Sequence, residues 1–186
     1  MGKVVLGMTM SVDGFVNDHN GSINKLYPDL KGLQDSKYLQ DSIRNTGAVV
    51  MGKNAYAMAE DPDWFAGNYE YQVPIFVLCR TAPKKHPRET DKLTFTFVTD
   101  GVESAIMQAK TVAGKKDVTV IGGASTVQQL LRAGLVDELH VDIMPIILTN
   151  GLRFLEELGE KEIQLEKIRV IEVGSRTSIQ FRVKNE

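Results

Sequence analysis

Residues 117–134 read DVTVIGGASTVQQLLRAG, and this stretch passes from a strand pattern into a helix pattern. The run DVTVI is rich in β-branched apolar residues, which favours a buried strand. Two glycines end that run, and Val127, Leu130 and Leu131 then recur at the spacing of one helix face. Gly134 follows where a glycine commonly ends a helix. A strand that turns tightly into a helix is the repeating unit of an α/β sheet.

The same unit recurs along the chain. Apolar runs predict strands at 3–10, 48–51, 74–79, 94–98, 117–121 and 138–147. Helical patterns lie between several of them, at 36–44, at 53–60 and after Asp100, which could cap a helix. Alternating apolar residues on both sides of Gly174-Ser175 predict a terminal antiparallel hairpin. Together these patterns predict one α/β domain over 1–186, a three-layer α-β-α sandwich with a mostly parallel sheet.

The composition excludes several classes of function. The net charge of -2 leaves no basic footprint of the kind that nucleic-acid-binding proteins carry. The single cysteine, Cys79, excludes an internal disulfide, and the three histidines lie too far apart for metal-ligand spacing. No apolar run approaches the length of a membrane span, and the N-terminal run is too short for a signal peptide. We therefore expect a soluble, cytoplasmic protein without a metal site.

Glycine, hydroxyl and basic residues follow three of the predicted strands, at 52–54, 79–81 and 122–126. In open α/β sheets, ligands bind outside the carboxyl ends of the strands. Two of these ends lead directly into helix N-termini, whose unpaired N–H groups suit an anion. Lys53 and Arg80 add positive charge. Together the three ends predict a ligand with several phosphates.

The motifs favour one dinucleotide over others. The chain contains neither the G-x-x-x-x-G-K-[ST] pattern of a P-loop nor a G-x-G-x-x-G after its first strand. An NAD site would place an acidic residue at a strand end for the ribose 2′-hydroxyl, whereas this chain has Arg80 and Thr81. A cation beside a hydroxyl suits a 2′-phosphate, which favours NADP over NAD.

Five stretches, taken in order, resemble the dihydrofolate reductase superfamily: GMTMSVDGFVND (7–18), VVMGKNAY (49–56), PIFVLCRT (74–81), VTVIGGASTVQQLL (118–131) and GLVDELHVDIMPIIL (134–148). Within it, the chain is most similar to the reductase domain of the riboflavin-biosynthesis deaminase–reductase. The similarity extends over about residues 3–182. It implies a dihydrofolate reductase-like fold, NADPH as cofactor and a homodimer.

The resemblance also implies a cofactor site. Its residues would contact the phosphates (Gly52, Lys53, Asn54), the adenosine 2′-phosphate (Leu78, Arg80, Thr81), the pyrophosphate and nicotinamide (Gly122, Gly123, Ala124, Ser125, Thr126) and the carboxamide (Thr9, Val16). In this superfamily the peptide between the paired glycines is cis, so we expect a cis bond between 122 and 123. The loop 11–30 would be the mobile loop that closes over the active site.

Three carboxylates are candidates for the proton-transfer role. Dihydrofolate reductases place one at the start of the first helix, where the count lands on Ser36 beside Asp35. Asp35 equally suits a helix N-cap. Asp142 would share a strand face with His140, either as a proton donor in the pocket or as a charge at a sheet edge or dimer contact. Asp13, beside a turn glycine, is the third candidate.

The substrate positions depart from the family pattern. Phe15 stands where riboflavin enzymes carry a lysine, and only Lys37, Arg44 and Arg153 are candidates for holding a ribose phosphate. Aromatic walls could come from Tyr38, Tyr56, Trp64 and Phe65. We therefore expect an NADPH-dependent reductase of a small heterocycle, by family proximity 5-amino-6-(5-phosphoribosylamino)uracil. A dihydrofolate or pterin reductase and an NADP-binding module without turnover are the alternatives.

Overall fold

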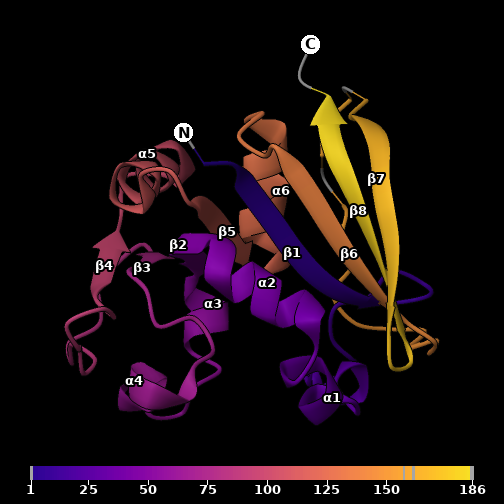
Figure 1. Cartoon of the computed structure of the whole chain (residues 1–186), viewed down its shortest axis with the longest axis horizontal. Helices are drawn as coiled ribbons and strands as arrows, with labels where there is room; N and C mark the ends of the chain where they lie inside the picture. The colour runs from indigo at the N-terminus through magenta and orange to yellow at the C-terminus, as the bar shows by residue number, and fades with distance from the viewer. Residues whose placement is uncertain (1, 157, 161, 185–186) are drawn as a thin grey trace.

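One eight-stranded sheet runs through the molecule in the computed structural model, which describes residues 2–156, 158–160 and 162–184. Its strands are β1 (Val4–Ser11), β2 (Thr46–Gly52), β3 (Ile75–Leu78), β4 (Phe95–Val98), β5 (Asp117–Ile121), β6 (Glu138–Met144), β7 (Gln164–Val173) and β8 (Arg176–Lys184). The order across the sheet is β4-β3-β2-β5-β1-β6-β8-β7. β1 to β6 are mutually parallel, whereas β8 pairs antiparallel with both β6 and β7. The predicted mostly parallel sheet with a terminal hairpin is confirmed (Figure 1).

Helices cover both faces of this sheet. The helical segments are η1 (Asn24–Leu26), α1 (Leu30–Gln34), α2 (Lys37–Asn45), α3 (Lys53–Tyr56), η2 (Pro62–Trp64), α4 (Phe65–Asn68), α5 (Val102–Ala113) and α6 (Ala124–Arg132). On β2, Ala48 and Val50 pack with buried residues of α5 and α6, while Val49 and Met51 pack on the opposite face, where Leu39 of α2 joins them. Figure 1 shows α2 in front of the sheet. The predicted three-layer sandwich is therefore confirmed.

Two predicted helix boundaries are wrong. The helix expected over 53–60 ends at Tyr56, and Asp61 then starts a separate 3-10 turn by accepting a hydrogen bond from the Asp63 N–H. Asp100 does not cap α5, because Gly101 occupies the N-cap position and makes no side-chain cap there. Gly134 does follow α6 with a φ of 65°, as expected for a glycine that ends a helix.

Ser36 starts α2, and this cap carries a prediction. Its Oγ accepts a hydrogen bond from the Leu39 N–H at 3.2 Å. We expect Ser36→Ala to lower the free energy of unfolding by about 1 kcal/mol, because a helix N–H loses its acceptor. Urea denaturation measures the change. Ser36→Thr keeps a capping hydroxyl and should lose clearly less, and an equal loss in both variants would show that capping is not the cause.

Candidate active site

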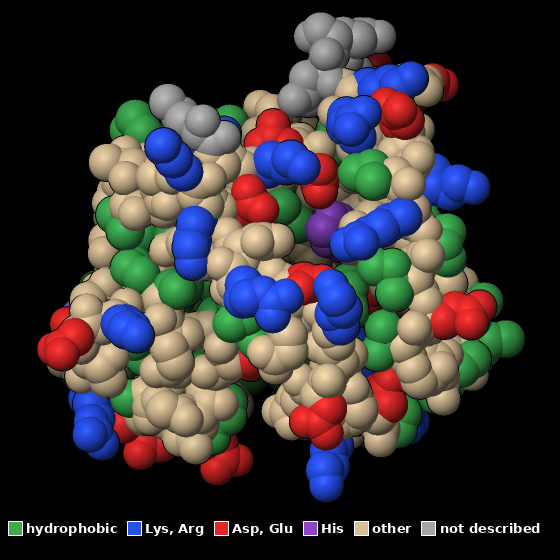
Figure 2. All heavy atoms as spheres, viewed as in Figure 1, with side chains coloured by type: hydrophobic (Ala, Val, Ile, Leu, Met, Phe, Trp, Pro, Cys, Tyr) green, Lys and Arg blue, Asp and Glu red, His purple; other side chains and the backbone are tan. Residues whose placement is uncertain are grey.

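A cleft of about 1930 Å³ crosses the sheet and is lined by residues of all six parallel strands. It extends from Leu78 at the end of β3 to Asp142 on β6, beneath residues of α2. Figure 2 shows the surface hollowed between the lobe that carries α4 and the lobe that carries α1. The cleft therefore joins the predicted phosphate-binding strand ends to the strand that carries Asp142.

At one end of the cleft, the loops after β2 and β5 pack closely against each other. The Gly52 N–H donates to the Gly122 carbonyl at 3.3 Å. A side chain at position 52 would place its Cβ 2.5 Å from the Thr126 hydroxyl oxygen. A Cβ at position 122 would lie 3.3 Å from that of Ala55. These glycines therefore bring the starts of α3 and α6 side by side.

The start of α6 is open to a ligand. Gly123 is its N-cap and no side chain caps the helix. The first turn consequently presents backbone N–H groups, with the exposed Ser125 hydroxyl beside them. Lys53 and Arg80 are exposed and line the same end of the cleft. Backbone donors and two cations fit a dinucleotide that carries several phosphates.

The structure places nearly all of the predicted cofactor residues along the cleft. Those lining it are Thr9, Val16, Gly52, Lys53, Asn54, Leu78, Arg80, Gly122, Gly123, Ala124, Ser125 and Thr126. Thr81 is exposed and is not part of the lining.

The predicted cis peptide between Gly122 and Gly123 is wrong, since no cis bond occurs between described residues. Gly122 instead turns the chain through its positive φ of 57°. This conformation, which glycine adopts without a steric penalty, leads β5 into α6 with a trans bond.

The other end of the cleft is built around a buried arginine. Arg176 is only 1% exposed. It donates to both carboxylate oxygens of Asp29, from Nε at 3.0 Å and from Nη2 at 2.7 Å. Its Nη1 donates to Asp142 Oδ2 at 3.2 Å and to Thr9 Oγ1 at 3.3 Å. Arg176 therefore ties the segment before α1 to β1 and β6.

Tyr38 of α2 completes this group. Its hydroxyl donates to Asp142 Oδ1 at 3.1 Å. Burial and the neighbouring Asp142 carboxylate raise the pKa of Tyr38 above its usual range. Asp142 is itself 7% exposed and lines the cleft together with Tyr38 and His140. The predicted shared face of His140 and Asp142 is thus present, with a phenol beside the carboxylate.

Asp13 lies outside the cleft lining, so the geometry does not support the predicted proton-donor role. It accepts hydrogen bonds from Ser11 Oγ at 2.6 Å and from the N–H groups of Leu148 and Thr149 at 3.0 and 2.8 Å. These contacts, the Ser11 bond foremost, lower the pKa of Asp13 to about 2. These hydrogen bonds give the Asp13 carboxylate a structural role, since they join the turn after β1 to residues 148 and 149.

Further hydrogen bonds hold the first part of the predicted mobile loop. The Val12 N–H donates to the Ile146 carbonyl, and the Val16 N–H donates to the Leu152 carbonyl, both at 2.9 Å. The Leu152 N–H in turn donates to Asn17 Oδ1 at 2.8 Å. Residues 12–17 are therefore held against the segment that follows β6.

Asp35 also has no place in the cleft. It is exposed, follows α1 as its C-cap and is not part of the lining. Ser36, not Asp35, caps α2, because only Ser36 has its side chain on the Leu39 N–H. The helix-start carboxylate of dihydrofolate reductases has no counterpart at Asp35.

The three candidates for a ribose phosphate contact lie outside the cleft lining as well. Lys37 and Arg44 both pair with Asp41, at the surface of α2. Arg153 pairs with Glu156 at 3.4 Å, and its guanidinium lies 4.5 Å from the centre of the Phe15 ring. Each of these cations already has a partner.

The sequence pattern missed Arg176, Asp29 and the hydroxyl of Tyr38. In β8 the apolar residues alternate with Arg176, Ser178 and Gln180, and this alternation predicts a solvated polar face. The structure buries all three polar residues, at 1%, 0% and 4% exposure. A buried arginine becomes recognisable only when its carboxylate partners, 34 and 147 residues away in sequence, are brought to it.

The family model for the RibD C-terminal domain matches residues 2–179. The chain belongs to the RibD C-terminal domain family. This match covers both ends of the cleft, from the strand with Thr9 to the strand with Ser178. Among the described residues, no group of three or more His, Cys, Asp or Glu side chains could hold a metal ion. None of the helices in this part of the chain has the length and apolar character to cross a lipid bilayer.

Solved structures show the same fold. A proposed riboflavin biosynthesis protein from Shewanella sp. PV-4 aligns with a TM-score of 0.79 and 23% identity, covering 98% of this chain and 99% of its own. The riboflavin biosynthesis reductase Rib7 of Saccharomyces cerevisiae gives 0.62 and 14%, covering 98% and 90%. Dihydrofolate reductase from Enterococcus faecalis, complexed with NADP(H), gives 0.65 and 14%, covering 99% and 98%. This member of the RibD C-terminal domain family thus has a dihydrofolate reductase-like fold, and the solved structures that resemble it include reductases.

Proposed function

We propose that this protein is a reductase that uses NADPH to reduce a small pyrimidine- or pterin-like heterocycle. One observation carries the proposal: a single cleft joins the open start of α6 to the partly buried Tyr38–Asp142 pair. The similarity to Rib7 and to a dihydrofolate reductase that was crystallised with NADP(H) supports the same reading.

The strand ends of β3, β2 and β5 are neighbours in the sheet, and we assign them to the cofactor. The first N–H groups of α6 and the Lys53 ammonium would hold the pyrophosphate, and Arg80 would hold the 2′-phosphate. When bound, NADPH supplies the hydride. The protein's own contribution is to fix the position of the cofactor and to exclude water.

Asp142 and Tyr38 are assigned to the substrate. Asp142 accepts from Tyr38 and from Arg176, and its remaining lone pairs suit the N–H groups of a heterocycle. The Tyr38 hydroxyl is the donor of this pair, so it would give its proton to a ring nitrogen as the hydride arrives, and the phenolate left behind would take a proton from solvent. Arg176 is a positioning residue, because it orients the Asp142 carboxylate from a fully enclosed position.

The Tyr38 hydroxyl gives a direct test of this assignment. We expect Tyr38→Phe to lower kcat by about 10²-fold, the lower end of general acid–base effects, and to leave NADPH affinity unchanged. The reason is that the variant keeps the ring packing and removes only the hydroxyl that donates to Asp142. Stopped-flow NADPH oxidation measures kcat, and isothermal titration calorimetry measures the affinity.

Tyr56→Phe is the matched control. The Tyr56 hydroxyl is buried without a hydrogen-bond partner among the described residues, and Tyr56 does not line the cleft. This variant should keep the wild-type kcat. A Tyr38→Phe enzyme with the wild-type kcat would contradict the proton-transfer assignment.

Steady-state NADPH oxidation with a panel of pyrimidines and pterins tests the proposed function itself. By resemblance, 5-amino-6-(5-phosphoribosylamino)uracil is the first compound to test and dihydrofolate the second. Tight NADPH binding without oxidation of any compound would instead favour a binding module without turnover. The homodimer that the resemblance implies stays a prediction, which the mass in analytical ultracentrifugation tests.

A further inference from the structure

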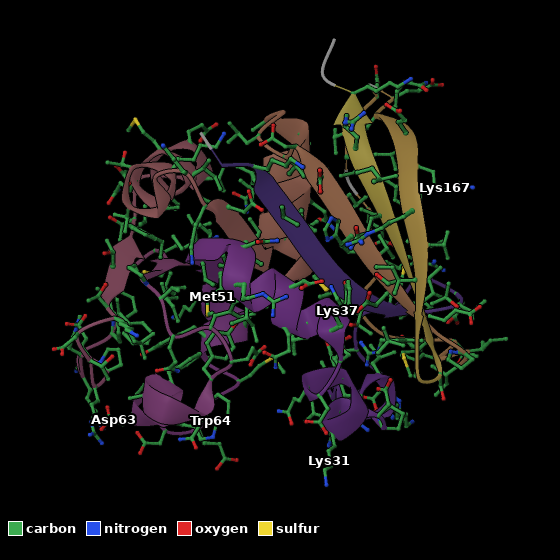
Figure 3. The ribbon with its side chains drawn as sticks, viewed as in Figure 1. Lys31, Lys37, Met51, Asp63, Trp64 and Lys167 are labelled. Atoms are coloured by element: carbon green, nitrogen blue, oxygen red, sulfur yellow. The ribbon has the colours of Figure 1, made fainter. Side chains whose placement is uncertain are left out.

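Exposed apolar side chains from four separate segments ring the mouth of the cleft. Leu30 of α1, Met58 after α3, Trp64 of η2 and Leu152 after β6 are 48%, 54%, 48% and 47% exposed, and all four line the cleft. Figure 3 shows Trp64 at the edge of the molecule beside α4, whereas Met51, which is buried, lies nearer the middle of the view. Apolar side chains left in water around a cleft are typical of a surface that a ligand covers.

The lysine and arginine side chains that line the cleft lie at one of its ends. Among the described lining residues, Lys53 and Arg80 are the only lysine and arginine, and both lie at the strand ends assigned to the cofactor. Glu60 and Asp61 after α3 also belong to the lining, as do Glu70, Asp142 and Glu156, the last of which pairs with Arg153. The substrate end therefore disfavours a phosphate group on the substrate, in addition to the phosphates of the cofactor.

None of the described lysine and arginine side chains near the substrate end belongs to the cleft lining, including Lys31, which is exposed beside Leu30 on α1. Arg176 is enclosed between Asp29 and Asp142. Arg169 donates from Nε to Gln180 Oε1 at 2.6 Å. Lys25 lies 3.7 Å from the carboxylate of Asp18. None of these three residues lines the cleft.

His140 adds no positive charge at neutral pH. It lines the cleft, but burial lowers the pKa of its imidazole below the usual value, despite the Glu138 carboxylate at 3.1 Å. A phosphate dianion bound here would lose its hydration and meet carboxylates, without a lysine or arginine among the described lining residues at this end to compensate.

We infer that the substrate, within the reductase function proposed above, is an unphosphorylated, neutral or cationic heterocycle that carries an apolar substituent. Its ring edge meets Asp142 and Tyr38, and its substituent lies across the mouth residues Leu30, Met58, Trp64 and Leu152. The substituent removes these side chains from water, which stabilises the complex. The inference departs from the phosphorylated pyrimidine that the family resemblance suggests.

Three pterins that differ only at ring position 6 test this inference: 6-methylpterin, 6-benzylpterin and the phosphate ester of 6-hydroxymethylpterin. Their affinities for the NADPH-loaded full chain are measured by calorimetry. We expect 6-benzylpterin to bind at least ~10-fold more tightly than 6-methylpterin, as burial of an aromatic ring should provide. The phosphate ester should bind at least ~10-fold more weakly than 6-methylpterin.

Two variants tie these differences to the mouth of the cleft. Met58→Ala should reduce the gain from the benzyl group at least ~3-fold. Met107→Ala on α5 should leave it unchanged, because Met107 is 66% exposed but does not line the cleft. Leu30→Lys should narrow the difference between the phosphate ester and 6-methylpterin, since it adds a cation at the mouth.

A phosphate ester that binds as tightly as 6-methylpterin, a benzyl group that adds nothing, or a failure of all three pterins to bind would each overturn the inference. An NADPH titration of the protein without cofactor distinguishes failure of this inference from failure of the proposed reductase function. Retained NADPH binding with any of these results overturns the substrate class alone, whereas absent NADPH binding overturns the reductase proposal as well.

Discussion

Replacing Arg176 with methionine is expected to lower the free energy of unfolding by about 3–5 kcal/mol, the cost of removing one partner from a buried ion-pair cluster. Arg176 is 1% exposed and donates to Asp29, Asp142 and Thr9. Methionine fills much of the same volume, so the loss comes mainly from two carboxylates left without their cation. Urea denaturation at neutral pH measures it.

Arg182→Met on the same strand is the matched control. Its guanidinium is 3.0 Å from Glu166, but the two side chains are 58% and 51% exposed. Water screens such a pair, so this variant should lose less than about 1 kcal/mol. Losses of similar size in the two variants would show that the Arg176 cluster does not stabilise the fold as described.

The loss of unfolding free energy caused by Arg176→Met should also depend on pH. Hydrogen bonding to Arg176 lowers the pKa of Asp29 in the folded protein. Such a carboxylate adds stability above its pKa in the unfolded chain, and this stability is lost as the pH falls through the lower folded value. Because the variant lacks this contribution at every pH, the difference from wild type should shrink in acid, below about pH 4.

Replacing Arg80 with glutamine is expected to weaken NADPH binding by about 10- to 150-fold while leaving NADH binding unchanged. The range corresponds to a hydrogen bond to a charged group, worth about 1.5–3 kcal/mol. Arg80 follows β3, is exposed and lines the cofactor end of the cleft. Parallel titrations with NADPH and NADH separate the 2′-phosphate contact from general loss of the site.

Arg88→Gln provides the control for charge alone. Arg88 is exposed in the loop that follows β3 but does not line the cleft. The Arg88→Gln substitution removes the same formal charge as Arg80→Gln and should leave the affinities for NADPH and NADH within about 2-fold of wild type. If Arg80→Gln weakened NADH as much as NADPH, the assignment of Arg80 to the 2′-phosphate would be wrong.

Most of the fold could be predicted from the sequence because the strand and helix periods are strong. The apolar run at 117–121 and the stripe at Val127, Leu130 and Leu131 correspond to β5 and α6 as expected. Boundaries were less reliable where a local contact decides them. The Asp61 side chain caps the separate 3-10 turn η2, and Gly101 rather than Asp100 is the N-cap of α5.

The two ends of the site differ in how much of each can be predicted from the sequence. The end that we assign to the cofactor is built from short contiguous stretches, so the position of Gly52 and Ser125 after predicted strands is enough to predict that they line the cleft. The substrate end is built from contacts between distant segments. Arg176 follows a turn in a strand whose polar alternation predicts exposure, and its burial follows only from tertiary packing.

A crystal structure of the protein with NADPH tests the central claim most directly. The account predicts that the pyrophosphate lies at the start of α6, that the 2′-phosphate lies within hydrogen-bond distance of Arg80, and that the nicotinamide faces the Asp142 end of the cleft. NADPH bound elsewhere on the protein, or a cleft that stays empty at saturating NADPH, would contradict it.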